Sequence, residues 1–182
     1  MSIARVFLLT GILAAIGAGC TTTGKTTGDV IDDTAIASTV KTRLLREDFG
    51  EGLEVNVEAY KGIVQLGGFI DEDTAARRMV EVARSVDGVV EVDNAMQERG
   101  PERSTGQAVD DGITTSRIKA RIAAEDFGDG LALNVSTYNG NVLISGFVTS
   151  SKAKASIEDI AERDDNTRRV INNLRVVDPD IR

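Results

Sequence analysis

Every aromatic side chain beyond the first twenty residues occurs twice, at one fixed spacing. Phe49 pairs with Phe127, Tyr60 with Tyr138 and Phe69 with Phe147, and each pair is separated by 78 residues. Several glycines follow the same offset, among them Gly62 with Gly140 and Gly68 with Gly146. Aromatic side chains fill cores and glycines fix backbone conformations, so neither is readily moved. The chain therefore contains one small domain built twice, each copy about 65 residues long.

The first copy shows a succession of helical and strand patterns that the second copy repeats. Apolar residues recur every four positions at Ile36, Val40 and Leu44, as in an amphipathic helix, and we expect the preceding pair Asp32-Asp33 to cap it, as Asp110-Asp111 would in the second copy. Further patterns predict strands at 53–57, 63–70 and 90–96 and a second helix at 73–86. With two helices for every three strands, we expect both helices to cover the same face of the sheet. The sequence thus predicts an α+β fold of two tandem α-β-β-α-β domains, each a three-stranded sheet with two helices on one face.

Glycines and the polar segment between the copies refine this organisation. Gly68 and Gly146 interrupt the second strand of each copy, where we expect a helix to lie close to the sheet. Asn139-Gly140 is a pair favoured in two-residue type I′ hairpins. The expected parts are a leader at 1–19, a lipidated and flexible tether at 20–32, a first domain at 33–97, a linker at 98–108 and a second domain at 109–178. The sequence does not indicate whether the two domains dock on each other.

The acidic charge of the chain is unevenly divided between the copies. The whole chain has a formal charge of −8, and residues 29–97 alone hold seven basic and fifteen acidic side chains. Residues 108–182 hold ten basic and twelve acidic side chains, a charge of −2. Nucleic acid is not expected as a partner, because phosphate contact needs a basic footprint. If one domain approaches an anionic surface, we expect it to be the second, which would leave the acidic first domain available to protein partners.

The missing residue types exclude several kinds of chemistry. The chain has no histidine and one cysteine, Cys20. Intrachain disulfides, Cys/His zinc sites and Ser-His-Asp or Cys-His catalysis are therefore excluded. The triplet Asp48-Phe49-Gly50 lacks the companion motifs of a kinase and favours a helix end, and the acids at 71–73 lack calcium-loop spacing and favour a helix start. We expect no catalytic residues, no cofactor and no metal site.

The N-terminal segment has the layout of a bacterial export signal. Arg5 precedes an apolar run over residues 6–16, which is too short to span a bilayer as a helix. The next residues, Gly-Ala-Gly-Cys at 17–20, resemble the lipobox of bacterial lipoproteins, with Gly17 where that motif usually has leucine. The resemblance implies cleavage before Cys20, its lipidation and, because no aspartate follows, delivery to the outer membrane facing the periplasm. The alternative is ordinary signal cleavage that leaves a free thiol.

Two sequence stretches resemble a known bacterial domain family. In the first copy they read GIVQLGGF at 62–69 and VDGVVEVDN at 86–94, and the second copy repeats the former as GNVLISGF at 140–147. Together with the element order they resemble the BON domain, and a lipobox before two such domains is similar to the dual-BON outer-membrane lipoproteins. The resemblance implies a non-enzymatic protein that binds anionic phospholipid through its second domain and supports envelope integrity. The alternative, implied by the OsmY branch of the family, is a periplasmic chaperone or adaptor.

Basic side chains flank the apolar stripe of the first helix in the second copy. At about 100° per residue, Arg117 and Arg121 lie on one side of Ile118 and Ile122, and Lys119 lies on the other. Long basic side chains beside an apolar stripe can reach lipid phosphates while their stems cover apolar surface. We therefore expect Arg117, Lys119 and Arg121 to bind phospholipid headgroups, with plain solvation as the alternative. We expect Ile118 and Ile122 to face the core.

Overall fold

A computed structural model describes residues 27–47, 49, 54–127 and 132–178, which form four helices and six strands in two repeats. The first repeat consists of α1 (Thr27–Arg46), β1 (Glu54–Tyr60), β2 (Ile63–Ile70), α2 (Asp73–Arg84) and β3 (Glu91–Glu98). The second repeat consists of α3 (Thr105–Ala124), β4 (Ala132–Tyr138), β5 (Asn141–Val148), α4 (Ser151–Glu162) and β6 (Arg169–Val176). The element order is therefore the predicted one in both copies.

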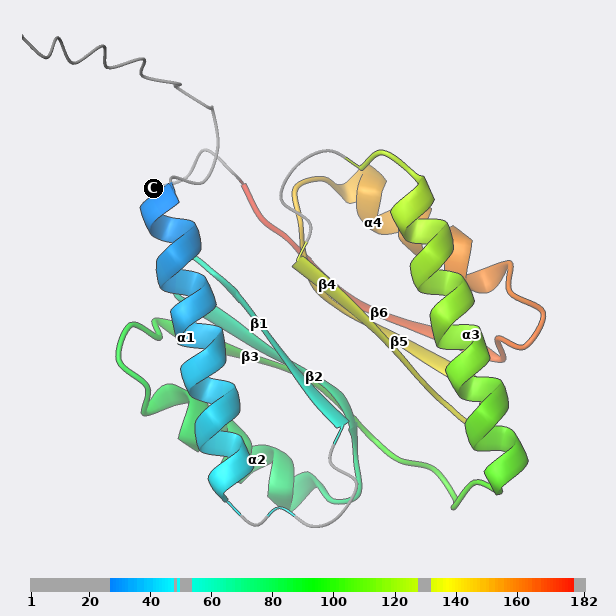
Figure 1. Ribbon diagram of the computed structural model, residues 1–182, viewed down its shortest axis with the longest axis horizontal. Helices are drawn as coiled ribbons and strands as arrows, with labels where there is room; N and C mark the ends of the chain where they lie inside the picture. Colours follow the sequence, from blue (N-terminus) through cyan, green and yellow to red (C-terminus); the bar gives the residue numbers. More distant parts are fainter. Residues whose placement is uncertain (1–26, 48, 50–53, 128–131, 179–182) are drawn as a thin grey trace, which may run out of the picture.

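Each repeat builds one three-stranded sheet around its second strand. β2 pairs antiparallel with β1 and parallel with β3, and β5 does the same with β4 and β6. The register is also repeated, because Val57 lies opposite Leu66 and Val135 lies opposite Ile144. Figure 1 shows α1 and α2 on one face of the first sheet and α3 and α4 on one face of the second. This confirms the predicted α+β fold with two helices on one face of each sheet.

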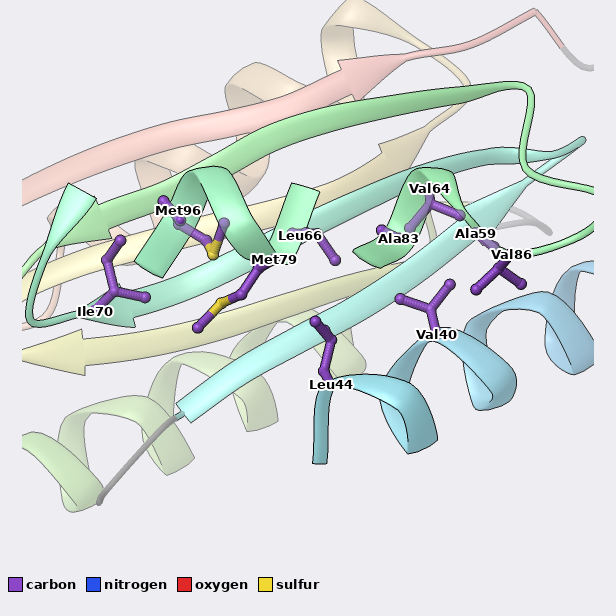
Figure 2. Packing of buried hydrophobic residues seen from close by; sticks show 11 residues of the cluster. Val40, Leu44, Ala59, Val64, Leu66, Ile70, Met79, Ala83, Val86 and Met96 are labelled. Atoms are coloured by element: carbon purple, nitrogen blue, oxygen red, sulfur yellow. The ribbon is translucent and has the colours of Figure 1, made fainter. Parts of the chain in front are cut away.

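The core of each repeat lies between its sheet and its two helices. In the first repeat Val40 and Leu44 of α1 meet Met79 of α2 over the strand residues Val64 and Leu66, as Figure 2 shows. The second repeat packs the equivalent side chains, with Ile118 and Ile122 from α3. The described residues of both cores lie between positions 36 and 177, so a chain that starts at residue 21 keeps all of them. Residues 21–182 are therefore expected to fold without the N-terminal segment.

A buried aspartate in the first helix of each repeat holds the hairpin that follows. Asp33 accepts hydrogen bonds from the N–H groups of Lys61 and Gly62 at 2.8 and 2.9 Å, and Asp111 accepts from those of Asn139 and Gly140 at the same two distances. All four turn residues have positive φ, as a type I′ hairpin requires. The expectation that Asp33 caps its helix was therefore wrong. Asp33 lies within α1 and not at its start, and its carboxylate accepts hydrogen bonds from the turn of the neighbouring hairpin instead.

Both first helices begin earlier than the apolar pattern predicts. The last six residues of the expected tether, 27–32, belong to α1. In the second repeat Ser104 and Gln107 form a capping box, in which each side chain accepts a hydrogen bond from the backbone N–H of the other residue. That box starts α3 at Thr105, inside the expected linker. It pairs backbone N–H groups at the helix start, so the first turn can form without apolar residues that pack on the core. The four-residue apolar series is not continued into these turns, because the positions that would extend it, 28 and 32 in α1 and 106 and 110 in α3, are glycine and aspartate.

The glycines inside β2 and β5 serve a different purpose from the expected one. Gly68 has φ of +142° and Gly146 has φ of +119°, in the region that favours glycine. A Cβ on Gly68 would lie 2.1 Å from the carbonyl oxygen of Glu54, and one on Gly146 would lie 2.0 Å from that of Ala132. These nearest atoms belong to a strand and not to the helix that the sequence analysis expects. The close neighbour is the backbone of the adjacent strand.

The two sheets pack against each other through the faces that the helices leave open, as the view in Figure 1 shows. Two tilted aromatic pairs join them: Tyr60 lies 5.7 Å from Phe147 and Phe69 lies 5.7 Å from Tyr138, measured between ring centroids. Because each pair joins one repeat to the other, the aromatic repeat fills an interface between domains as well as the two cores. The described part of the molecule therefore has four layers, helices–sheet–sheet–helices.

Polar side chains fix the register of this sheet-to-sheet interface. Gln65, which is buried, donates from Nε2 to the carbonyl of Asn173 at 3.0 Å and accepts from the N–H of Gly146 through Oε1. At the interface Gly67 meets Ser145, and a Cβ added to the glycine would lie 2.1 Å from the serine Oγ. These two positions are related by the 78-residue offset. The domains can approach this closely only because one of the two equivalent positions has no side chain.

Candidate functional site

Helix α3 carries all three basic residues that the sequence singles out. Its inner face consists of Thr114, Ile118 and Ile122, which are buried against the second sheet. This confirms that the two isoleucines face the core. The orientation of the helix is therefore fixed, and the residues on its two flanks point to different surroundings.

Arg117 and Arg121 share a buried carboxylate, that of Asp164. The Arg117 Nε lies 3.4 Å and the Arg121 Nη1 lies 3.5 Å from Oδ2 of Asp164. The aspartate side chain is fully buried, whereas the two arginine side chains remain 42% and 47% exposed. Asp164 lies in the turn between α4 and β6, where its other oxygen accepts from the N–H of Asn166 at 3.3 Å. The carboxylate thus holds both guanidinium groups in place and leaves about half of each in solvent.

The matching corner of the first repeat is built without this charge. Val86 occupies the position equivalent to Asp164 and is buried in the first core. Arg43, the equivalent of Arg121, donates to the carbonyl and hydroxyl oxygens of Ser85 at 2.9 Å each. The paired arginines with a shared carboxylate are therefore a feature of the second domain among the described residues.

Two exposed apolar side chains extend the flank that carries Arg117 and Arg121. Val109 and Ile113 are 57% and 47% exposed, and each lies one helical turn from the next member of the series 109, 113, 117, 121. We call these four residues the α3 stripe. Sequence reasoning missed the two apolar members, although a signal was present. They repeat at a four-residue interval that is separate from the core series of Thr114, Ile118 and Ile122.

Lys119 does not belong to this stripe, because it lines a groove on the opposite flank of α3. The groove has a volume of about 490 Å³ and lies between α1, α3 and the edge strands β1 and β4. Lys41 of α1, which is the equivalent of Lys119 in the first repeat, lines the same groove. The structure therefore divides the three predicted headgroup ligands between two surfaces, with two arginines on one and the lysine on the other.

The two lysines of the groove act on a nearby carboxyl group. Burial raises the pKa of Glu58 on β1 above its ordinary value of 4.5, and the positive charges of Lys41 and Lys119 act in the opposite direction. Burial is the larger effect, so this side chain ionises less readily in the folded protein than an ordinary glutamate does.

The described residues contain no group of three or more Asp, Glu, His or Cys side chains that could hold a metal ion. Within the same part of the chain, no helix has the length and apolar character needed to cross a bilayer. The expected leader and the lipid-anchor residue Cys20 lie outside the described residues.

Comparisons with known proteins agree with the repeated architecture. The family model of the BON domain matches residues 32–100 and 110–178. The chain is 33% identical over 149 residues to the Osmotically-inducible protein Y of Escherichia coli, which covers 81% of this chain and 74% of that protein. It is 29% identical over 182 residues to the Outer membrane lipoprotein DolP of Haemophilus influenzae, which covers 96% and 93% of the two chains. A 21 kDa hemolysin of Actinobacillus pleuropneumoniae is 27% identical over 154 residues, covering 84% and 78%.

Proposed function

The chain belongs to the BON-domain family, and on that premise we propose that it is a non-catalytic outer-membrane lipoprotein that faces the periplasm and binds anionic phospholipid. One observation carries this proposal above others. The alignment with the Outer membrane lipoprotein DolP covers 96% of this chain, so the aligned span includes position 20. The aligned span therefore reaches residues 17–20, whose resemblance to a lipobox favours a lipid on Cys20 as the anchor.

The α3 stripe supplies the chemistry for contact with an anionic bilayer. Burial of an exposed aliphatic side chain such as Val109 or Ile113 contributes on the order of 1 kcal/mol. A basic side chain near an anionic surface contributes about 1 kcal/mol, and Arg117 and Arg121 lie one and two turns farther along the helix. Each contribution is small. A chain already tethered to the membrane needs no more, because the tether keeps the local concentration of lipid high.

Vesicle flotation of residues 21–182 tests the lipid contact without the anchor. We expect binding to vesicles that contain phosphatidylglycerol and none to vesicles of phosphatidylcholine alone. The variant Arg117→Gln/Arg121→Gln should lose most of this binding. The matched control is Lys41→Gln/Arg43→Gln, which removes two charges at α1 of the first repeat and should bind as before. Equal flotation of the protein on both kinds of vesicle, or full binding by the α3 variant, would refute the contact.

The contribution of Lys119 to lipid binding needs a separate test, because this side chain lines the groove and not the α3 stripe. The single variant Lys119→Gln distinguishes the two surfaces. If the stripe alone contacts lipid, this variant keeps its flotation, and a loss equal to that of the arginine variant would place the groove at the membrane.

The second candidate function is a periplasmic chaperone or adaptor. It is favoured by the 33% identity to the Osmotically-inducible protein Y. A light-scattering assay with a heat-unfolded client protein tests it: suppression of aggregation by residues 21–182 in the absence of lipid would favour this function. In that role the acidic first domain would be the part available to envelope proteins.

A further inference from the structure

The floor of the groove between the domains is made of two sheet edges. β1 pairs only with β2 and β4 pairs only with β5 among the described strands. Tyr60 faces Ile63 across the two-residue hairpin, so the alternation of an antiparallel pair turns the backbone groups of Val55 and Val57 away from β2. Both valines line the groove. Within the described residues, the N–H and C=O groups of Val55 and Val57 thus belong to no strand ladder and face this space.

The two edges meet without forming one continuous sheet. A side chain of β1 contacts one of β4, since Asn56 donates from Nδ2 to Oγ of Ser136 at 3.2 Å. On β4 the outward carbonyl of Thr137 already accepts from Arg103 at 3.2 Å, and Val135 is fully buried. β1 is more open along its length. The edge that can accept a further strand is therefore β1.

The walls of the groove carry positive charge and one exposed apolar side chain. Lys41 and Lys119 line it from α1 and α3, and within the described part of the chain neither lies within 4.0 Å of a carboxylate. Arg103 and Glu54 also line it and lie 4.0 Å apart, so their charges offset each other and the lysines leave the groove positive. Leu45 lies one turn after Lys41 and is 74% exposed. A guest segment would find hydrogen-bonding groups on the floor, two ammonium groups above it and an apolar contact beside them.

We propose that this groove binds an extended polypeptide segment with acidic side chains, which adds a strand to the edge of β1. Main-chain hydrogen bonds to β1 would provide affinity, and carboxylates opposite Lys41 and Lys119 would provide preference for acidic sequences. The polar floor, with Asn56, Asn134 and Ser136, suits a peptide backbone better than an acyl chain. This inference is independent of the lipid contact, because the groove and the α3 stripe lie on opposite flanks of α3.

The test uses residues 21–182 labelled with ¹⁵N and three synthetic eight-residue probes. The first alternates valine and glutamate, the second alternates valine and lysine, and the third is the first with alternate backbone nitrogens methylated. We expect the acidic probe to shift the amide signals of Val55 and Val57 and to slow their hydrogen exchange. The lysine probe and the methylated probe should do neither, because one lacks the charge and the other lacks the donors.

Variants then test the two walls. Lys41→Gln/Lys119→Gln should raise the Kd for the acidic probe about fivefold, as expected for the loss of two partly exposed ion pairs. The charge-matched control Arg84→Gln/Lys152→Gln lies outside the groove and should leave the Kd unchanged.

Three results would overturn the proposal. They are equal binding by the methylated probe, an unchanged Kd in the lysine variant, and perturbation of the groove amides by micelles of lysophosphatidylglycerol but not by the acidic probe. The last result would make the groove a lipid site. A failure of vesicle flotation would leave these measurements unaffected, so the two proposals fail separately.

Discussion

The shared carboxylate of Asp164 gives the lipid proposal a test in which binding should increase. Asp164 lies fully buried between Arg117 and Arg121, at 3.4 and 3.5 Å from them. The three side chains together carry one net positive charge. Replacement Asp164→Asn raises that to two and keeps an oxygen that can accept from the N–H of Asn166. It also turns a buried amide N–H toward the two guanidinium groups, so we expect the free energy of unfolding to fall by about 1–3 kcal/mol.

The magnitude follows from the charge added beside the membrane. One additional positive charge near an anionic surface contributes about 1 kcal/mol, which corresponds to about fivefold tighter binding. Titration of residues 21–182 with phosphatidylglycerol-containing vesicles measures this directly. At high salt the gain should disappear, because a Debye length of about 3 Å at 1 M screens exposed charges.

The matched control is Asp159→Asn. Asp159 lies on α4 and pairs with Arg163 at 3.9 Å, with both side chains mostly exposed. The Asp159→Asn substitution also removes one negative charge from the second domain, but away from the α3 stripe, and should therefore increase vesicle affinity far less. Unchanged or weaker binding by a folded Asp164→Asn protein would refute the reasoning, because it would mean that the two arginines do not face the lipid.

Three further predictions test the fold, the groove and the anchor. Gly67→Val should push the sheets apart, because a Cβ there meets the Ser145 Oγ, and should lower the free energy of unfolding by about 1–3 kcal/mol. Small-angle scattering should show a larger radius of gyration for this variant and not for Gly100→Ala, which has open space around it. Glu58→Gln should raise the Tm at neutral pH, because the raised pKa of Glu58 means that stability falls as pH rises above 4.5, and the gain should vanish below that pH. Cys20→Ala should move the protein from the membrane fraction to the soluble fraction of cells, and unchanged fractionation would contradict the lipid anchor.

The repeat made most of the fold predictable. A spacing of 78 residues kept by three aromatic pairs and several glycines identifies two equal domains, and the change from four-residue to two-residue periodicity gives the element order. The hairpin was predictable for the same kind of local reason, because Asn139-Gly140 suits two positive φ angles. These signals depend on short stretches of chain, which is why they could be interpreted one element at a time.

The features that were missed depend on contacts between distant segments. Asp33 resembles a helix cap in sequence, but the N–H groups that it satisfies belong to residues 61 and 62. Docking of the two sheets was not predicted, although Phe69 and Gln65 both lie on the strand face opposite Val64 and Leu66. An aromatic ring on the outer face of a sheet indicates a covered surface. The sequence could not say that the cover is the other copy.

The candidate site was predictable in its residues but not in its surroundings. Helical geometry correctly separated Lys119 from Arg117 and Arg121, on opposite flanks of Ile118. Only the structure shows that one flank meets the buried carboxylate of Asp164 and the other opens on a groove shared with Lys41. The apolar members of the stripe were missed because Val109 precedes the predicted start of the periodic pattern.

The most direct test of the central claim, that α3 contacts anionic lipid, is fluorescence from a single label on the stripe. Residues 21–182 contain no cysteine, so Ile113→Cys can be labelled selectively with the environment-sensitive dye NBD. The control is Ala35→Cys, the exposed equivalent position on α1. The account predicts that phosphatidylglycerol vesicles shift the emission of the label at 113 to the blue and leave the label at 35 unchanged. No shift at 113, or equal shifts at both positions, would contradict it.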